Sequence, residues 1–407
     1  MTGTKMRPFT ETIPIDRARA LIAERISPIT RTERVALEQA AGRVLSTDVI
    51  AEADVPPFSR AGMDGYAVRA TDTHGATRST PLTLTSLGQA FTGDPASLVV
   101  TAGTCVEIAT GAPMPDGADA VVMVEDTYRA GNTVSIFTSV EPLQHVGRQG
   151  ADISRGQKVL SRGDGLNASR VGALAALGLA EVDVFARPRV TILSTGNEII
   201  EPGTPLGPGQ IYDINRFTVS ALVADNGGLP VPRRVARDTL EDLERAVQEA
   251  QSDDLIVFSG GSSVGERDLI LDVMRAHGTL VFHGLAIKPG KPTAFGLMGS
   301  VPFFGLPGYP TSCLSNAYIL LAPALRQLAR LAPRRTGSLR LPLGKAVVSP
   351  RGRHQFFSVR LEGGVVMPAF KGSGDITSMS QADGYIEIPV DVERMEAGQL
   401  VEVSLFL

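Results

Sequence analysis

The sequence predicts a multidomain protein of the α/β plus β class, with one doubly wound α/β domain accompanied by β-rich domains. The chain has 407 residues, more than one ordinary domain holds. Strand-like and helix-like segments alternate from residue 189 to 330, which is typical of a parallel sheet covered by helices. Short alternating apolar segments, cut by Gly, Pro and Asp, fill residues 80–145 and 338–407 and indicate β-structure.

The amino-terminal part is expected to hold helices around a β insertion. Ile15, Ala18 and Ile22 recur at helical spacing, and a second turn or helix is expected within 30–45, ended by Gly42. Alanine and leucine predict another helix at 166–180. The expected domains are a discontinuous helical domain (1–50 and 146–185), an inserted β domain (51–145), an α/β domain (186–332) and a carboxy-terminal β domain (333–407).

Within the α/β domain we expect a parallel sheet, and Thr239 is expected to cap a helix. Loops that follow parallel strands open on one edge, where such sheets bind ligands. The five expected strands lie at 189–194, 231–238, 254–258, 279–283 and 301–304, and the four helices at 215–228, 239–250, 266–278 and 311–330, the last bent by Pro323.

Three loops of one kind, SGGSSVGERD (259–268), IKPGKP (287–292) and GLPGYP (305–310), suit an anionic ligand. Glycine allows close backbone approach, and proline restricts the loop. The first and third loops lead into expected helices, whose amino termini would offer free N–H groups. Lys288 and Lys291 repel each other unless an anion lies between them. A phosphorylated or oxyanion ligand is therefore expected, with surface solvation of the lysines as the alternative.

Three acids lie at or beyond the ends of expected strands: Glu198, Asp238 and Asp268. Together they could form a pocket for Mg²⁺ beside the glycine loops. The alternatives are a solvated turn for Glu198 and helix-start roles for Asp238 and Asp268. Asp64 and Thr110 lie in loops that a turn explains as readily.

Composition argues against several classes of partner and compartment. The net charge of −4 attracts neither nucleic acid nor anionic membrane, and no apolar run is long enough to span a membrane. The two cysteines, Cys105 and Cys313, show no metal-ligand spacing, and Cys313 is expected to be a buried helix residue. A cytoplasmic protein is expected.

Seven motifs occur in one order along nearly the whole chain: PPFSRAGMDGYAV, TGAPMPDGADAVVMVED, GADISRG, STGNE, SGGSSVG, IKPGKP and GLPGYP. In this the sequence resembles the molybdopterin molybdenumtransferases, the MoeA proteins related to the E domain of gephyrin. The resemblance implies a doubly wound domain similar to MoaB and MogA, a helical amino-terminal domain, an inserted β domain and a carboxy-terminal β-barrel. It also implies that molybdate is inserted into adenylylated molybdopterin, with release of AMP.

The resemblance further implies a Mg²⁺-dependent homodimer with an inter-subunit active site, and the molybdopterin adenylyltransferase is a possible partner. The implied catalytic residues are Asp64, Thr110, Glu198, Asp238, Asp268, Lys288 and Lys291, of which Glu198, Asp238 and Asp268 would hold the metal. The implied pterin-binding residues are Ser194, Gly196, Gly260, Gly261, Ser262, Ser263, Gly265, Pro289, Gly290, Pro307, Gly308 and Pro310.

The sequence departs from the family pattern at Ala61-Gly62, Ser262 and Tyr309. Tyr309 stands beside the expected pterin pocket, where it could alter selectivity between molybdate and tungstate. Two other functions stay open at this point. One is a pterin-binding scaffold without turnover, and the other is the preceding reaction, adenylylation of molybdopterin, which a similar α/β fold could perform.

Overall fold

A computed structural model of the chain describes residues 12–233, 239–260, 269–334 and 337–406. The chain forms two compact units. The larger unit holds Met1–Glu33, Gly42–Val44 and Asp183–Leu407, and the smaller unit holds Arg34–Ala41 and Leu45–Val182. The structure thus divides into two compact units, and the limits of the four expected domains stay predictions. The predicted fold class, α/β plus β, is confirmed by the sheets described below.

The α/β sheet has six strands, in the order β16-β13-β17-β21-β20-β18. The first four run parallel, and β20 lies antiparallel to both of its neighbours. β18 therefore runs in the same direction as β21, so the five predicted strands are parallel as expected. The sequence did not indicate β20, which a short hairpin turn joins to β21. The strands are β13 (Arg189–Ser194), β16 (Leu229–Pro232), β17 (Leu255–Ser259), β18 (Thr279–His283), β20 (Ala294–Met298) and β21 (Val301–Leu306).

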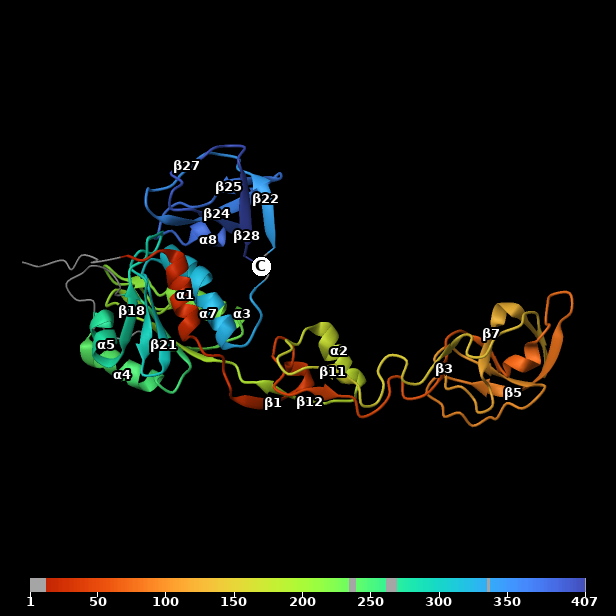
Figure 1. Cartoon of the computed structure of the whole chain (residues 1–407). Helices are drawn as coiled ribbons and strands as arrows, with labels where there is room; N and C mark the ends of the chain where they lie inside the picture. Colours follow the sequence, from red (N-terminus) through yellow and green to blue (C-terminus); the bar gives the residue numbers. More distant parts are fainter. Residues whose placement is uncertain (1–11, 234–238, 261–268, 335–336, 407) are drawn as a thin grey trace, which may run out of the picture. The chain divides into compact units, whose positions relative to one another are not determined.

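Helices cover both faces of this sheet (Figure 1). Val257 packs into the core with α1 (Ile15–Arg25), α3 (Asn215–Asp225) and α7 (Ala322–Leu328). Its neighbours Ile256 and Phe258 pack with α4 (Leu240–Ala250) and α5 (Leu269–His277) on the other face. Successive strand residues point to opposite faces, so a nearly continuous apolar run is what a doubly covered strand requires.

Two predictions about individual helices are confirmed. The Thr239 side chain accepts a hydrogen bond from the Asp242 N–H at 3.3 Å and caps α4. The helix expected at 311–330 is interrupted near Pro323. It consists of α6 (Pro310–Asn316), a π-helical turn (Ala317–Leu321) and α7. Proline has no N–H to continue the regular ladder, which accounts for the interruption.

The smaller unit contains the expected β module, a six-stranded sheet in the order β7-β4-β6-β5-β9-β8. Asp64, expected in a loop, directly precedes β4 in the interior of this sheet. The strands are β4 (Gly65–Val68), β5 (Leu82–Ala90), β6 (Thr104–Ile108), β7 (Ala120–Met123), β8 (Thr127–Ala130) and β9 (Thr133–Ile136).

Of the second turn or helix expected within 30–45, a short turn is present and a longer helix is not. Residues 32–36 form strand β1 (Thr32–Ala36), which pairs with β12 (Glu181–Phe185) and ends in a short 3₁₀ turn (Leu37–Gln39). Such pairing can override a helical apolar pattern. The helix expected at 166–180 is present as α2 (Ala168–Ala176), and two short pairs join β2 (Val49–Ile50) to β11 (Lys158–Leu160) and β3 (Arg60–Ala61) to β10 (Val146–Gly147).

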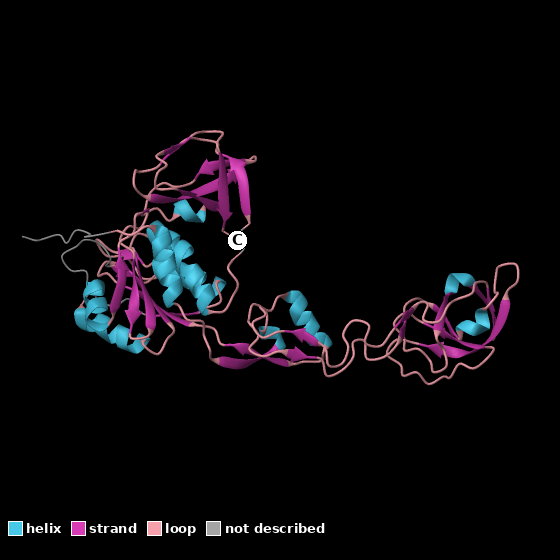
Figure 2. Cartoon of the chain, in the orientation of Figure 1, coloured by secondary structure: helices cyan, strands magenta, loops and turns pink. Residues whose placement is uncertain are grey.

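The carboxy-terminal region consists mostly of strands (Figure 2). They form a third six-stranded sheet, ordered β19-β24-β26-β28-β22 with β25 paired to β24. Its edge strand β19 comes from the α/β segment and carries Lys288. The sequence did not indicate this exchange. The strands are β19 (Ile287–Lys288), β22 (Ser338–Pro342), β24 (His354–Glu362), β25 (Val365–Pro368), β26 (Gly384–Ile388) and β28 (Leu400–Leu405), beside the small pair β23 (Val347–Val348) and β27 (Arg394–Met395) and helix α8 (Thr377–Ser380).

Across the described ranges, no helix is long and apolar enough to cross a membrane. Cys105 and Cys313 are both buried free thiols. Burial raises the pKa of each thiol to about 12.

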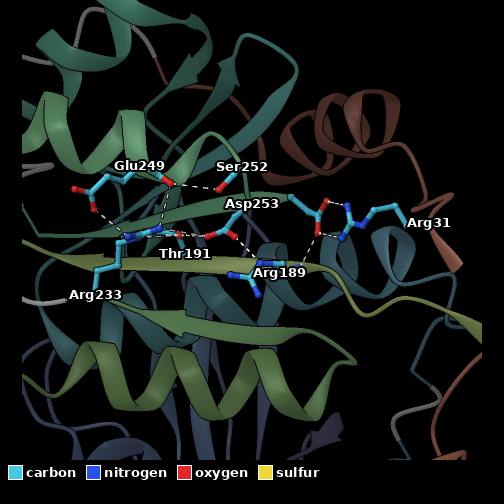
Figure 3. A network of polar contacts seen from close by, with 8 residues as sticks. Arg31, Arg189, Thr191, Arg233, Glu249, Ser252 and Asp253 are labelled. Atoms are coloured by element: carbon cyan, nitrogen blue, oxygen red, sulfur yellow. Dashed lines mark hydrogen bonds and ion pairs between the residues drawn. The ribbon is translucent and has the colours of Figure 1, made fainter. Parts of the chain in front are cut away.

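A buried carboxylate fixes the edge of the α/β sheet at which β13 and β17 begin (Figure 3). Asp253 is 4% exposed and accepts hydrogen bonds from Thr191 Oγ1 at 2.5 Å and Arg189 Nε at 2.8 Å. The adjacent Asp254 accepts two hydrogen bonds from Arg31, at 2.6 and 2.7 Å. Because strands β13 and β17 start here, the network lies at the edge opposite their carboxyl ends.

We expect Asp253→Ala to destabilise the α/β domain by about 2–4 kcal/mol, because it leaves the buried Thr191 hydroxyl and the Arg189 guanidinium without their acceptor. Urea dependence of hydrogen exchange at β13 and β17 amides would measure the loss. Glu249→Ala is the control, since this exposed partner of Arg233 should contribute less than about 1 kcal/mol. Equal losses in the two variants would contradict the assignment.

Candidate functional site

Three parallel strands of the α/β sheet end at one level. Ser194, Ser259 and Leu306 are register partners at the carboxyl ends of β13, β17 and β21. The three loops that leave these ends stay in backbone contact. Thr195 N–H donates to Ser259 O at 3.1 Å, and Gly260 N–H donates to Leu306 O at 3.3 Å. The expected convergence of the STGNE, SGGSSVG and GLPGYP loops on one edge is therefore present at their first residues.

Glycine is required at the centre of this contact. Gly260 has a φ of +110°, and a Cβ there would lie 2.5 Å from Thr195 O. Gly308 approaches it from the third loop, since a Cβ on Gly308 would lie 3.4 Å from Gly260 Cα. The loops can meet in this way because the glycines leave backbone atoms uncovered.

The two lysines lie on a closed turn between β19 and β20. Leu285 N–H donates to Lys291 O at 2.8 Å across the base of the turn. Lys288 is the last residue of β19, in register with Gln355 of β24. Both lysine side chains are partly buried. The turn is thus fixed from below by its own backbone and from one side by the carboxy-terminal sheet.

Glu198 is the one predicted metal ligand within the described residues. Its side chain is exposed and folds back over Gly196, where a Cβ would lie 2.8 Å from the carboxylate oxygens. The described ranges contain no group of three His, Cys, Asp or Glu residues placed to hold a metal. The predicted residues Asp238, Gly261, Ser262, Ser263, Gly265 and Asp268 lie outside the described residues.

Two residues that sequence reasoning missed support the first and third loops. Asp213 is 3% exposed and accepts a hydrogen bond from Ser194 Oγ at 3.1 Å. Asn215 donates from Nδ2 to Gly308 O at 2.7 Å. Both lie at the start of α3, where Asp213 also accepts from the Arg216 N–H. The sequence signal for these two residues is Asp-x-Asn before a predicted helix, a pattern that is equally typical of an ordinary helix start.

The third loop presents an exposed aromatic ring and a covered helix start. Tyr309 is 69% exposed, beside Gly374 of the carboxy-terminal region. The Thr311 N–H donates to Ser373 O at 3.0 Å, and Pro310 has no N–H. The prediction that this helix start offers free N–H groups is therefore wrong at its first two residues.

Cys313, in the same helix, is buried as predicted, and its raised pKa keeps the thiol protonated. A thiolate nucleophile at this position is therefore not available.

In the smaller unit, Asp64 and Thr110 lie together as a hydrogen-bonded pair. Asp64 Oδ1 accepts from the Thr110 N–H at 2.6 Å and from the Thr110 hydroxyl at 2.8 Å. The sheet explains this, because Asp64 precedes β4, Thr110 follows β6, and Gly65 pairs with Ile108 between them. The backbone N–H, followed by the hydroxyl, lowers the pKa of the Asp64 carboxyl below its ordinary value. The Asp64 side chain is thus an exposed carboxylate that its two donors keep ionised.

Comparisons with known proteins agree with this geometry. Three family models match in chain order: the MoeA N-terminal region (domain I and II) at residues 13–178, a probable molybdopterin binding domain at 191–327, and the MoeA C-terminal region (domain IV) at 340–406. The three loops and the Lys-Pro-Gly-Lys turn lie within the second match, which places the protein in the class with a molybdopterin-binding α/β domain.

Relatives that match over nearly their full length narrow the class to a family. The molybdopterin molybdenumtransferase of Haemophilus influenzae is 35% identical, covering 97% of this chain and 98% of its own. Molybdopterin molybdenumtransferase 2 of Mycobacterium tuberculosis is 36% identical over 92% of this chain and 94% of its own. A molybdopterin biosynthesis MoeA protein from Pyrococcus horikosii has a crystal structure with a TM-score of 0.84, at 40% identity over 98% of this chain and 100% of its own.

The chain belongs to the molybdopterin molybdenumtransferase family, whose members are transferases of molybdenum cofactor biosynthesis.

We expect Asp64 to titrate below its ordinary pKa of about 3.9. Thr110→Ala should raise this pKa only in part, because the stronger donor, the backbone N–H, remains. Since the folded pKa is lowered, the stabilisation is complete above the unfolded pKa and is lost as the pH falls through the folded one. Carboxyl-carbon NMR titration would measure both values. A wild-type Asp64 that titrates at or above its ordinary pKa would contradict the hydrogen-bonded pair.

Proposed function

We propose that the protein inserts molybdate into adenylylated molybdopterin, releasing AMP and the molybdenum cofactor. The observation that carries this proposal is the edge at which β13, β17 and β21 end in register and glycine-containing loops meet. The Lys288–Lys291 turn leads to the same edge, because Ala294 at the start of β20 pairs with Gly305 near the end of β21. Uncovered backbone suits close approach of a phosphate, and two ammonium groups suit a doubly charged oxyanion. These are the two kinds of anion that the reaction must bring together.

The lysines of the turn would collect molybdate, and the loops around Gly260 and Gly308 would bind the pterin and its phosphate. The bond between that phosphate and the adenylate then breaks when a water or molybdate oxygen attacks phosphorus, and AMP leaves. Molybdenum then forms bonds to the two dithiolene sulfurs of the substrate, and one molybdate oxygen leaves as water with the two thiol protons, without a change of oxidation state. No thiol of the protein is needed, which agrees with the protonated, buried Cys313.

The Glu198 side chain is chemically suited to bind a magnesium ion, because its exposed carboxylate offers the oxygen ligands that Mg²⁺ prefers. We propose that Glu198, Asp238 and Asp268 hold this ion. When bound, it would neutralise charge that develops on the phosphate oxygens.

The ionised Asp64–Thr110 pair belongs to the smaller unit, whereas the lysines and glycine loops belong to the larger unit. We propose a cytoplasmic homodimer in which the pair of one subunit completes the site of the other. The molybdopterin adenylyltransferase is the proposed partner that supplies the substrate. Because a carboxylate held by two donors stays charged in the reaction, Asp64 would position or polarise a group of the substrate.

The function is tested by anaerobic release of AMP from adenylylated molybdopterin, titrated with Mg²⁺ and with molybdate or tungstate. Release that depends on the oxyanion is expected, and the two titrations would show which oxyanion Tyr309 tolerates. Binding of the pterin without AMP release would indicate a scaffold. Consumption of ATP with release of pyrophosphate would indicate the adenylylation step instead.

We expect Asp64→Asn and Lys288→Gln each to lower the rate of AMP release by at least about 100-fold, as losses of charged active-site groups commonly do. Matched controls are Asp48→Asn and Lys158→Gln. Asp48 is an exposed aspartate of the smaller unit whose pKa the Arg162 N–H lowers, and Lys158 is its exposed ion-pair partner. Rates equal to those of the controls would remove Asp64 and Lys288 from the site.

The inter-subunit site is tested by mixing the two inactive variants. If each site combines Asp64 of one subunit with Lys288 of the other, subunit exchange should restore about one quarter of the wild-type sites. AMP release should rise only after the subunits of the two variants have been dissociated or unfolded and have exchanged partners. No recovery in verified mixed dimers would show that each site lies within one subunit.

A further inference from the structure

A buried asparagine on α6 forms hydrogen bonds to the turn that carries Lys288 and Lys291. Asn316 is fully buried, and its Nδ2 donates to Gly290 O at 3.1 Å and to Thr293 Oγ1 at 2.7 Å. The Thr293 hydroxyl in turn donates to Gly290 O at 2.8 Å. The carbonyl of Gly290, at the centre of the turn, therefore accepts from two side chains.

Other contacts of the turn lie at its base and along one side. Gly284 N–H donates to Thr293 O at 2.9 Å below the Leu285–Lys291 bond, and β19 pairs with β24. None of these bonds reaches Gly290, at the top. Gly290 has a φ of +99°, and a Cβ there would overlap Asn316 Nδ2. The amide of Asn316 thus occupies the space that the glycine leaves open, and it fixes the top of the turn to the helix.

Asn316 contacts the turn as a hydrogen-bond donor. Its Oδ1 is buried and has no partner among the described residues, which costs stability that an apolar side chain would not. The helix also changes to a π-helical turn at the next residue, Ala317. Distortions of this kind are frequent at functional sites.

We propose that Asn316 is a positioning residue that holds Lys288 and Lys291 at the separation an oxyanion requires. This inference rests on the proposed function, since it assigns the turn to molybdate. Two ammonium groups repel each other, and a loose turn would let them move apart in the empty site. An anion would then have to reorder the turn on binding, which weakens its affinity. Asn316 removes that requirement by fixing the turn in advance.

The test compares Asn316→Ala and Thr293→Val with a matched control, Asn226→Ala. Asn226 is equally buried, donates from Nδ2 to Leu222 O at 2.8 Å, and also has a partnerless Oδ1 among the described residues. It lies at the end of α3, away from the turn. Calorimetric titration with molybdate alone should give a Kd about tenfold weaker for the first two variants and nearly unchanged for the control.

Two further measurements separate positioning from general destabilisation. The KM for molybdate in AMP release should rise in Asn316→Ala while kcat stays within about twofold, because saturating anion reorders the turn. NMR of reductively ¹³C-methylated lysines, assigned with Lys→Arg variants, should show the signals of Lys288 and Lys291 moved in Asn316→Ala and unmoved in Asn226→Ala.

The outcomes distinguish the two proposals. Unmoved lysine signals in Asn316→Ala, or an equal loss of molybdate affinity in Asn226→Ala, would overturn the positioning role. Moved lysine signals in a protein that binds no molybdate, even in its wild-type form, would overturn the proposed function and leave the contact between Asn316 and the turn intact.

Discussion

Parallel strands that end at one level determine where the described residues of the three glycine-containing loops leave the sheet. Register pairing places Ser194, Ser259 and Leu306 side by side, so the loops that follow leave the sheet together. Two apolar cores on opposite faces of the sheet fix this register, because a slip by one residue would exchange buried side chains between the faces. The site is thus a consequence of core packing, and the glycines let the loops use it.

The residues that carry charge are held by neighbours far away in the sequence. Lys288 lies on a strand of the carboxy-terminal sheet, and its turn is fixed by a side chain of α6. Asp213 and Asn215, at the start of α3, hold the first and third loops. Asp64 is kept ionised by Thr110, which follows the adjacent strand β6. Lys288 and Asp64 are therefore held by strands and side chains around them, which favours an arrangement prepared before the substrate binds.

The sequence predicted what depends on local pattern. Apolar runs located β13, β17 and β21, and glycine-rich motifs located their loops. It could not predict what depends on long-range pairing. β20 follows a proline-rich turn and pairs through a hairpin, and β19 joins a sheet whose other strands follow 50 or more residues later. Asn316 looked like any polar residue in a helix, because its meaning comes from Gly290, which only the folded chain brings near.

The shared strand β19 has a consequence for how the chain could have been assembled. In a protein built from independent modules, each module can be exchanged or lost without exposing the interior of another. Here the carboxy-terminal sheet takes its edge from the α/β segment, so removal of residues after 333 would leave β19 with unpaired N–H and C=O groups. The two segments are therefore expected to be inherited together, and recombination between relatives should preserve them as one block.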